Sequence, residues 1–336
     1  MLDLEQLEPY LSIHINGFAG PVTVRTFPKG QSNPTFLLTT PTRKYVLRKK
    51  PEGKLLKSAH AVEREFCVQS ALLGSDVPVA RVLHLCLDAS VLGTEFYVME
   101  FADGRVFWDP ALPDLSRCDR QKVYAEMARV LAAIHSVDLN ATGLHNFGKP
   151  EGYFARQLRR WSSQYAALRD KQSPEMDELI DWLKENLPED DGQVVLVHGD
   201  YRIDNLMFEA DSFRVKAVFD WELSTLGHPL ADLAYQVMQR AMGRDWQLKG
   251  LQGLDLEALG IPSEENYVSA YCSHRDLDGI AHWKFAKAFA FFRFSIICHG
   301  VEKRESEGNA ASPDARCVGK MAPLLARIGY NLIKKK

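Results

Sequence analysis

The chain has few of the features that mark secreted, zinc-binding or nucleic-acid-binding proteins. Its six cysteines include no CxxC pair, which argues against a zinc site and against a disulfide framework in a chain of 336 residues. The net charge of -3 lacks the basic excess of a general nucleic-acid binder. We therefore expect reduced thiols and no nucleic-acid partner.

Targeting signals and long apolar runs are also missing. The N-terminus, Met1-Leu2-Asp3-Leu4-Glu5, lacks the basic segment and apolar core of a signal peptide. The most apolar late segment, residues 285–298, contains Lys287 and Arg293, which predicts a buried helix with two polar edges and not a membrane span. We expect a cytoplasmic protein without a membrane partner.

Two well-known phosphate-binding loops are absent. No GxxxxGK[ST] segment occurs, and no GxGxxG precedes a predicted helix or strand. A shorter turn, Lys29-Gly30-Gln31-Ser32-Asn33-Pro34, lies between two predicted strands. Its Ser32 hydroxyl and backbone N–H groups could cover phosphates, although such a turn alone is weak support.

The N-terminal part of the chain predicts a small β-rich lobe. Leu4, Leu7 and Leu11 share one helical face, so residues 3–13 should form a helix. Short β-branched or aromatic runs separated by turns predict antiparallel strands, and a second helix is expected over 59–73. The expected strands are 22–27, 35–40, 44–48, 82–87 and 96–100.

The rest of the chain is mainly helical. Apart from two strands near residues 194–197 and 215–219, the periodicity predicts helices over 119–135, 153–170, 174–187, 229–241, 263–273, 280–302 and 313–333. The fold class is therefore α+β, with a five-stranded antiparallel N-terminal lobe over 1–100 and a larger helical lobe over 101–336.

Chemically suited residues follow the two later strands. His198-Gly199-Asp200 comes after Val194–Val197, Asn205 lies five residues beyond Asp200, and Asp220 follows Val215–Phe219. Asp200 could orient an attacking hydroxyl, because a loose phosphoryl-transfer transition state needs mainly positioning. Asn205 and Asp220 offer the hard oxygen ligands that suit Mg²⁺. The set predicts phosphoryl transfer.

Further residues would hold a nucleotide. Alternation along the strand 45–48 puts Arg48 and Lys49 on opposite faces, and either cation could bind the phosphates of ATP. Glu65 could pair with that cation, and Glu63 is the competing candidate. If residues 96–101 form the inter-lobe hinge, their backbone amides, those of Glu100 and Phe101 included, would lie against an adenine ring; an ordinary core strand is the alternative.

Three polar residues are interpreted as supports for the 198–200 turn. His135 ends an apolar helix, and we favour a hydrogen-bonding role for it and for His198. Asp232 begins the helix after Gly227-His228-Pro229, where it could cap that helix or reach the backbone of the 198–200 turn.

Taken together, these motifs resemble the aminoglycoside phosphotransferase and choline-kinase-like superfamily, distant relatives of protein kinases. The resemblance implies a protein-kinase-like two-lobed fold, ATP and Mg²⁺ as cofactors, Asp200 as the catalytic residue, and Asn205 and Asp220 as metal ligands. It favours Glu65 as the ion-pair partner. Arg48 departs from the family pattern, where many relatives carry lysine; arginine keeps the charge.

A narrower resemblance concerns the acceptor. Segments such as Tyr45-Val46-Leu47-Arg48-Lys49-Lys50-Pro51 and Phe96-Tyr97-Val98-Met99-Glu100 are similar to the kinase modules fused to some acyl-CoA dehydrogenases. That similarity implies phosphorylation of a hydroxyacyl-CoA or hydroxy acid, with an acyl-CoA dehydrogenase as a separate functional partner.

The composition of the last third bears on the alternatives. Residues 223–336 hold 12 acidic and 15 basic side chains, so they lack the acidic bias that a polycationic aminoglycoside would favour. Arg156, Arg159 and Arg160 are candidate anion contacts, although a solvated basic helix face is the simpler interpretation. A kinase of an aminoglycoside, amino-alcohol or sugar, and a regulatory pseudokinase, stay open as alternatives.

Overall fold

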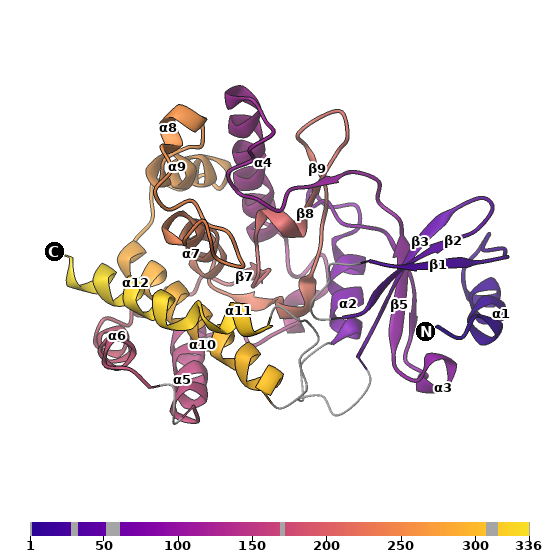
Figure 1. Cartoon of the computed structure of the whole chain (residues 1–336), viewed down its shortest axis with the longest axis horizontal. Coiled ribbons are helices and arrows are strands. Elements are labelled where there is room, and N and C mark those ends of the chain that lie inside the picture. The colour runs from indigo at the N-terminus through magenta and orange to yellow at the C-terminus, as the bar shows by residue number, and fades with distance from the viewer. Residues whose placement is uncertain (1, 28–32, 52–60, 169–171, 307–314, 336) are drawn as a thin grey trace. The chain divides into compact units, whose positions relative to one another are not determined.

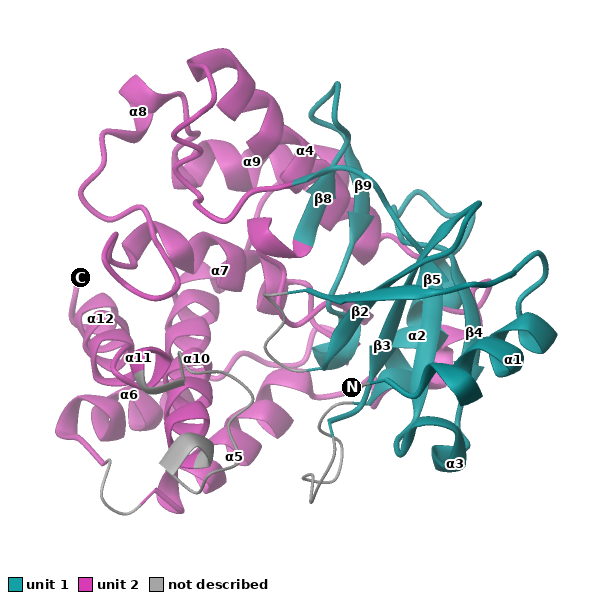
Figure 2. Ribbon diagram, turned by 45° about the vertical axis from the view of Figure 1, so that its right-hand side comes forward, with its two compact units in different colours: residues 1–105, 206–224 teal, residues 106–205, 225–336 magenta. Residues whose placement is uncertain are grey.

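The computed structural model describes residues 2–27, 33–51, 61–168, 172–306 and 315–335, and it divides into two units (Figure 2). Unit 1 comprises residues 1–105 and 206–224, and unit 2 comprises residues 106–205 and 225–336. The segment 206–224, which a boundary at residue 100 would assign to the second lobe, thus groups with the first unit. Each unit is described separately below.

Unit 1 is built on the predicted antiparallel sheet (Figure 1). Its five strands follow the order β1-β2-β3-β5-β4, and all neighbours run antiparallel. The elements are α1 (Leu4–His14), β1 (Thr23–Thr26), β2 (Thr35–Thr39), β3 (Lys44–Lys49), α2 (Val62–Leu72), β4 (Val82–Cys86), α3 (Ala89–Leu92) and β5 (Phe96–Glu100).

Alternation along the strands sends apolar residues to two separate cores. Leu47 of β3 packs in one core with Leu7 and Leu11 of α1. Its neighbour Val46 packs on the opposite face with Val62 of α2. Since successive strand residues face opposite sides, Arg48 shares the α2 face with Val46.

A second, smaller sheet completes unit 1. Sequence periodicity had not predicted two of its strands, β6 and β8, which are very short. Ala217 of the third strand packs in the same core as Val46 and Val62, so the residues that follow this strand lie beside β3 and α2. The sheet has the order β6-β8-β9, formed by β6 (Arg105–Val106), β8 (Leu206–Phe208) and β9 (Val215–Val218), followed by the short helix η4 (Trp221–Leu223).

Unit 2 is mainly helical, as expected. Its one two-stranded sheet among the described residues pairs β7 with β10, and the region expected as one helix over 313–333 contains two helices. The elements are α4 (Arg117–His135), η1 (Leu144–Asn146), α5 (Tyr153–Ala166), α6 (Pro174–Glu185), β7 (Val195–Val197), η3 (Ile203–Asn205), β10 (Thr225–Gly227), α7 (Leu230–Met238), η5 (Gln239–Ala241), α8 (Leu256–Leu259), α9 (Glu264–His274), α10 (Trp283–Ser306), α11 (Ala315–Gly319) and α12 (Ala322–Lys334).

The apolar helix α10 differs from its prediction in one respect. Lys287 lies at a polar edge, 2.6 Å from Glu264. Arg293 was expected at the other polar edge, but its side chain is buried. The buried guanidinium is accommodated because it donates a hydrogen bond to the carbonyl oxygen of Gly199. Within the described ranges, no helix has both the length and the apolar content needed to cross a membrane.

Candidate active site

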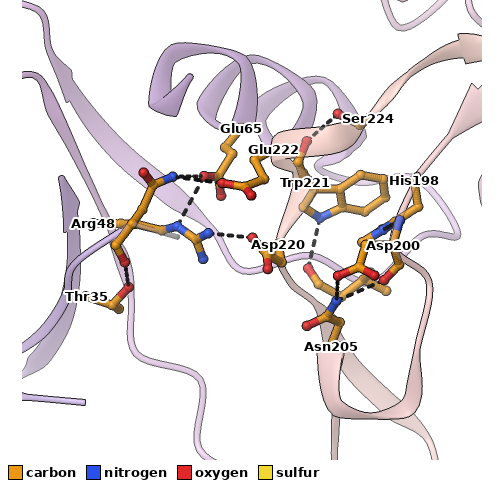
Figure 3. A network of polar contacts seen from close by, with 12 residues as sticks. Thr35, Arg48, Glu65, His198, Asp200, Asn205, Asp220, Trp221, Glu222 and Ser224 are labelled. Carbon is orange, nitrogen blue, oxygen red and sulfur yellow. Dashed lines mark hydrogen bonds and ion pairs between the residues drawn. The ribbon is translucent and has the colours of Figure 1, made fainter. Parts of the chain in front are cut away.

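The predicted functional residues fall into two polar clusters, one in each unit (Figure 3). Arg48, Glu65 and Asp220 meet in unit 1, and we call them, with Asn33 and Glu222, the Arg48 cluster. Asp200 and Asn205 lie in unit 2 and form the Asp200 cluster with Asp232, Tyr235, His135 and Arg293.

Arg48 connects β3 to two carboxylates. Its Nε lies 3.1 Å from Oε1 of Glu65, and its Nη2 lies 2.5 Å from Oδ1 of Asp220. Lys49 points to the opposite face of the sheet and donates to the carbonyl oxygen of Leu92 at 3.0 Å. Of the two candidate cations, Arg48 is therefore the one joined to the other predicted residues.

The same geometry separates the two candidate glutamates. Glu63 lies 3.0 Å from Lys50, with 42% of its side chain exposed. Glu65 is fully buried and pairs with Arg48, as the resemblance had implied. It also accepts from Asn33 Nδ2 at 2.9 Å and from the Tyr97 hydroxyl at 3.2 Å.

Burial opposes charge on both partners of this ion pair. Desolvation raises the pKa of Glu65 to about 7, although Arg48 and the two donors act in the opposite direction. Desolvation also favours the neutral form of Arg48, but Glu65 and Asp220 outweigh it and raise the pKa of the guanidinium above its ordinary value. Arg48 is thus a permanent cation held by two carboxylates.

Asp220 lies at the end of β9 in an uncommon backbone conformation. Its φ of 64° and ψ of 55° are left-handed, a region that aspartate tolerates better than most residues. The next turn is fixed because Trp221, fully buried, donates from Nε1 to the Val218 carbonyl at 2.9 Å. The Ser224 hydroxyl donates to the Trp221 carbonyl at 2.5 Å. Left-handed non-glycine residues of this kind are concentrated at functional sites.

The carboxylates of the Arg48 cluster have the chemistry of a magnesium site. Glu65, Asp220 and Glu222 each offer an oxygen, and these oxygens lie within 4.8 Å of one another. Hard oxygen donors that leave room for water and phosphate oxygens are what Mg²⁺ requires. The donor set therefore fits the metal that the family resemblance implies.

In unit 2, Asp232 holds the turn that precedes Asp200. Its two carboxylate oxygens accept the backbone N–H of His198 at 2.6 Å and of Gly199 at 2.8 Å. Of the two roles predicted for Asp232, contact with this turn is confirmed. Gly199 has a φ of 86°, so a side chain there would strain the turn.

His135 supports Asp232 from the end of α4. Its Nε2 lies 3.2 Å from Asp232, and its Nδ1 lies 2.7 Å from the Tyr271 hydroxyl, so the predicted bracing role has a structural basis. Burial lowers the pKa of His135, although Asp232 opposes the shift. Burial also disfavours charge on Asp232, but hydrogen bonding and the charge of the neighbouring histidines lower its pKa overall.

These shifts predict a pH effect on stability. A histidine whose folded pKa lies below its unfolded value binds fewer protons when folded, so its stabilising contribution is present above the unfolded pKa and is lost as the pH falls. Glu65, whose pKa is raised to about 7, acts in the opposite direction, so the contribution of His135 is obtained from the difference between variant and wild type. Between pH 7.5 and 5.5 we expect the free energy of unfolding of His135→Gln to fall less, or to rise more, than that of the wild-type chain, by up to about 1.4 kcal/mol per pH unit below pH 6.5.

Urea unfolding at the two pH values measures this effect. His145→Gln, at an exposed position of unit 2, is the matched control and should leave the pH dependence of the wild-type chain unchanged. An equal pH dependence of the free energy of unfolding in His135→Gln and in the wild-type chain would contradict the assignment.

The Asp200 carboxylate is held from both sides. The Tyr235 hydroxyl donates to Oδ1 at 2.6 Å, and Asn205 Nδ2 donates to Oδ2 at 3.0 Å and to the Asp200 carbonyl at 2.9 Å. Burial and the neighbouring Asp200 raise the pKa of Tyr235 well above its ordinary value, so its hydroxyl keeps its proton. Because Nδ2 of Asn205 faces Asp200, its amide oxygen points the other way.

Several residues of the two clusters had not been predicted. Tyr235 lies three residues after Asp232 on α7, so helical spacing alone would have put it on the same face. Arg293 donates to the Gly199 carbonyl at 3.0 Å, and a lone arginine inside an apolar helix was its signal. Asn33 belonged to the predicted 29–34 turn, but no role had been assigned to its side chain.

The remaining nucleotide-binding predictions, at Ser32, Glu100 and Phe101, stay predictions. Ser32 lies outside the described residues. The backbone N–H of Glu100 donates to the Arg81 carbonyl at 2.8 Å, and that of Phe101 donates to the Lys44 carbonyl at 3.3 Å. Both amides therefore already donate to backbone carbonyl oxygens of the same unit.

Comparison with known proteins places the chain in a family. The profile of the phosphotransferase enzyme family matches residues 23–269. A Ralstonia eutropha protein provisionally named an aminoglycoside phosphotransferase superposes with a TM-score of 0.88 at 47% identity, covering 100% of this chain and 99% of its own. Aminoglycoside phosphotransferase APH(4)-Ia, solved with AMP-PNP and hygromycin B, shares the fold at 16% identity and a TM-score of 0.64, covering 98% of this chain and 100% of its own.

Two curated mouse proteins are also similar to this chain. Acyl-CoA dehydrogenase family member 10 is 43% identical over 99% of this chain but 31% of its own length. Family member 11 is 42% identical over 99% of this chain and 43% of its own length. The chain thus spans less than half of either relative. With the family profile matching most of its length, the chain belongs to the phosphotransferase enzyme family and is a small-molecule kinase with a protein-kinase-like fold.

Proposed function

We propose that the chain transfers the γ-phosphate of ATP to the hydroxyl group of a hydroxyacyl-CoA or related hydroxy acid. The observation that carries the choice of acceptor is the match of almost the whole chain to part of two proteins named acyl-CoA dehydrogenases. A kinase module that accompanies such a dehydrogenase would act on the same kind of thioester. An acyl-CoA dehydrogenase is accordingly the proposed functional partner.

Asp200 is the proposed catalytic residue. Tyr235 and Asn205 both donate to its carboxylate, so its orientation is fixed before any substrate binds. In the proposed reaction the Asp200 carboxylate accepts a hydrogen bond from the acceptor hydroxyl. The oxygen of that hydroxyl attacks the γ-phosphorus, and the bond between the γ-phosphorus and the β–γ bridging oxygen breaks, so ADP leaves. Asp200 takes the proton of the hydroxyl late in the transfer. Positioning supplies most of the rate enhancement in such transfers.

Asn205 and Asp220 are the proposed Mg²⁺ ligands, and Glu222 is a further carboxylate beside Asp220. The amide oxygen of Asn205 is turned away from Asp200, and Asp220 belongs to a carboxylate set that fits the metal. When bound, the ion would neutralise charge on the phosphate chain. Arg48 is proposed to bind the α- and β-phosphates, with Glu65 holding it in place.

The base would be bound where β5 ends. Glu100 and Phe101 are proposed to offer main-chain carbonyl oxygens to the amino group of adenine, since their N–H groups are already donated within the sheet. Ser32 is proposed to donate to a phosphate. This part of the proposal predicts a preference for ATP over GTP, because guanine carries a carbonyl where adenine carries an amino donor.

An acceptor panel tests the proposed function. The chain would be incubated with Mg²⁺ and γ-labelled ATP and with 2-, 3- and 4-hydroxyacyl-CoA thioesters, free hydroxy acids, choline, a hexose and an aminoglycoside. We expect kcat/KM for one hydroxyacyl-CoA to exceed that of every acceptor from the other classes by about 100-fold, because a site built for one group leaves its polar contacts unpaired with others.

The other outcomes are equally informative. Phosphate transfer only to choline, the hexose or the aminoglycoside would contradict the proposed acceptor class but would still show kinase activity. Binding of ATP without transfer to any acceptor would favour the regulatory pseudokinase.

A further inference from the structure

Three arginines of unit 2, Arg156, Arg160 and Arg293, form a cluster beside the 198–200 turn that leads to Asp200. The cluster joins α5 to α10, which pack through Phe154 against Phe285 and Phe289 with ring centroids 5.2 Å apart. Arg293 of α10 donates to the Gly199 carbonyl, next to Asp200, and its guanidinium carbon lies 5.9 Å from the Trp161 ring of α5. The cluster therefore begins one residue from the proposed catalytic carboxylate.

Helical spacing gives α5 one basic face. Tyr153, Arg156 and Arg160 occupy positions i, i+3 and i+7, which lie on the same side of a helix. Burial and the charge of Asp232 raise the pKa of the Tyr153 hydroxyl, and the charges of Arg293, Arg156 and Arg160 oppose that shift. Arg159 lies about a quarter of a turn from the middle of this face, is exposed, and is not among the charges that act on Tyr153.

No described residue forms an ion pair with these cations. Among the residues that the structure describes, no carboxylate lies within 4.0 Å of the guanidinium groups of Arg156, Arg160 or Arg293. Nη1 of Arg156 is buried and makes no hydrogen bond to any described residue, while Nη2 donates to the Lys149 carbonyl at 2.6 Å. Arg293 is only 7% exposed. A buried, unmatched guanidinium costs free energy, which a bound anion would recover.

The indole ring of Trp161 lies between the arginines and adds an aromatic face to the cluster. Its ring lies 5.2 Å from the Arg160 guanidinium carbon and is partly exposed, and its Nε1 donates to Gln157 at 3.0 Å. An aromatic face flanked by guanidinium groups can stack a planar group while the arginines bind phosphate oxygens, often bidentately. The side chains thus combine stacking with anion recognition.

We infer that Arg156, Arg160, Trp161 and Arg293 form the acceptor-recognition surface of this kinase, and that it binds the phosphate-bearing part of a coenzyme A thioester. The inference depends on the proposed function, because it names what the acceptor presents beside its hydroxyl. Arg293, buried against the loop, lies nearest Asp200, while Arg160, at the exposed end of the surface, meets the phosphates. The surface is cationic, so a polycationic acceptor would be repelled from it.

Direct binding of coenzyme A tests the surface without any turnover. Isothermal titration of coenzyme A into the full chain is compared with titration of pantetheine, which lacks all the phosphates. We expect the double variant Arg156→Gln/Arg160→Gln to weaken coenzyme A binding by at least about tenfold, because charge-assisted hydrogen bonds to phosphate are lost. Arg159→Gln, on the same helix but off the face, is the matched control and should bind as the wild-type chain does. Equal affinity of the double variant and the control would overturn the inference.

The same variants separate this inference from the proposed function. With a hydroxyacyl-CoA and the matching hydroxyacyl-pantetheine as acceptors, the ratio of the two kcat/KM values should fall by at least about tenfold in the double variant. An unchanged ratio with active enzyme would reject the surface and keep the kinase. If neither thioester is phosphorylated while coenzyme A binding still depends on the arginines, the acceptor proposal fails and the anion surface stands. Circular dichroism and thermal unfolding confirm that the variants are folded.

Discussion

Replacing Asp200 by asparagine is expected to lower kcat by about 1,000-fold, because the change removes the carboxylate that orients the acceptor hydroxyl and takes its proton. The substitution keeps the size of the side chain. The Tyr235 hydroxyl can still donate to the remaining carbonyl oxygen, but the new amide then faces Nδ2 of Asn205, so two donors meet. Asp200→Ala removes the carboxylate without that conflict and should lose a similar factor.

Affinity for the nucleotide distinguishes a catalytic role from a structural one. We expect both variants to bind ATP within about twofold of the wild-type chain, since an interaction made only in the transition state changes kcat and leaves ground-state binding alone. Asp204→Asn is the matched control for the arginine that the two carboxylates share: Arg202 lies 3.1 Å from Asp204 and 3.3 Å from Asp200, so this variant shows how much of the loss comes from disturbing Arg202 alone. Transfer by Asp200→Ala at more than about a tenth of the wild-type rate would contradict a role in proton capture.

Much of the fold could be predicted from the sequence because its signals are local. Alternation and turn residues located all five strands of the unit 1 sheet, and apolar periodicity located most helices of unit 2. The strands that were missed, β6, β8 and β10, have only two or three residues, too few to show a period of two. Their pairing depends on partners far away in the sequence.

The grouping of residues 206–224 with unit 1 has the same cause. Nothing local in Leu206–Phe208 or Val215–Val218 shows which core they join. Ala217 packs with Val46 and Val62, contacts that span more than 150 residues of chain. Arg64 adds a further link by donating to the Ser224 carbonyl at 3.1 Å. Such packing is a tertiary choice that periodicity does not encode.

At the site, the motifs pointed to candidate residues but to only some of the residues that support them. Asp232 and His135 could be predicted because they flank recognisable segments. Asp232 contacts the 198–200 turn, and His135 contacts Asp232. Tyr235 and Arg293 could not, since a tyrosine and an arginine in apolar helices are compatible with many roles until the helices are packed. Strand alternation, which the sequence shows, puts Arg48 and Lys49 on opposite faces of the sheet. The choice between them also needed the face that α2 covers, and only the structure shows that face.

Breaking the Arg48–Glu65 ion pair is the second large effect that we expect. Arg48→Gln should lower kcat/KM for ATP by about 100-fold, because truncating one partner of a buried charge pair costs about 3 kcal/mol and removes the proposed phosphate contact. Glu65 is fully buried and touches Arg48, Asn33 and Tyr97, so it is a positioning residue in this scheme. Glu65→Gln should therefore cause a similar loss by releasing Arg48 to Asp220 alone.

The double variant decides whether the two residues act as one unit. If Glu65 acts only through Arg48, Arg48→Gln/Glu65→Gln should be no worse than either single change, a coupling of about 2.7 kcal/mol for a 100-fold effect. Lys50 and Glu63 form the control pair on the same two segments, with Glu63 partly exposed, and glutamine at both should change kcat/KM by less than about threefold. Arg48→Lys keeps the positive charge and should retain more activity than Arg48→Gln. Additive losses at Arg48 and Glu65 would show instead that Glu65 contributes independently, for example as a metal ligand beside Asp220 and Glu222.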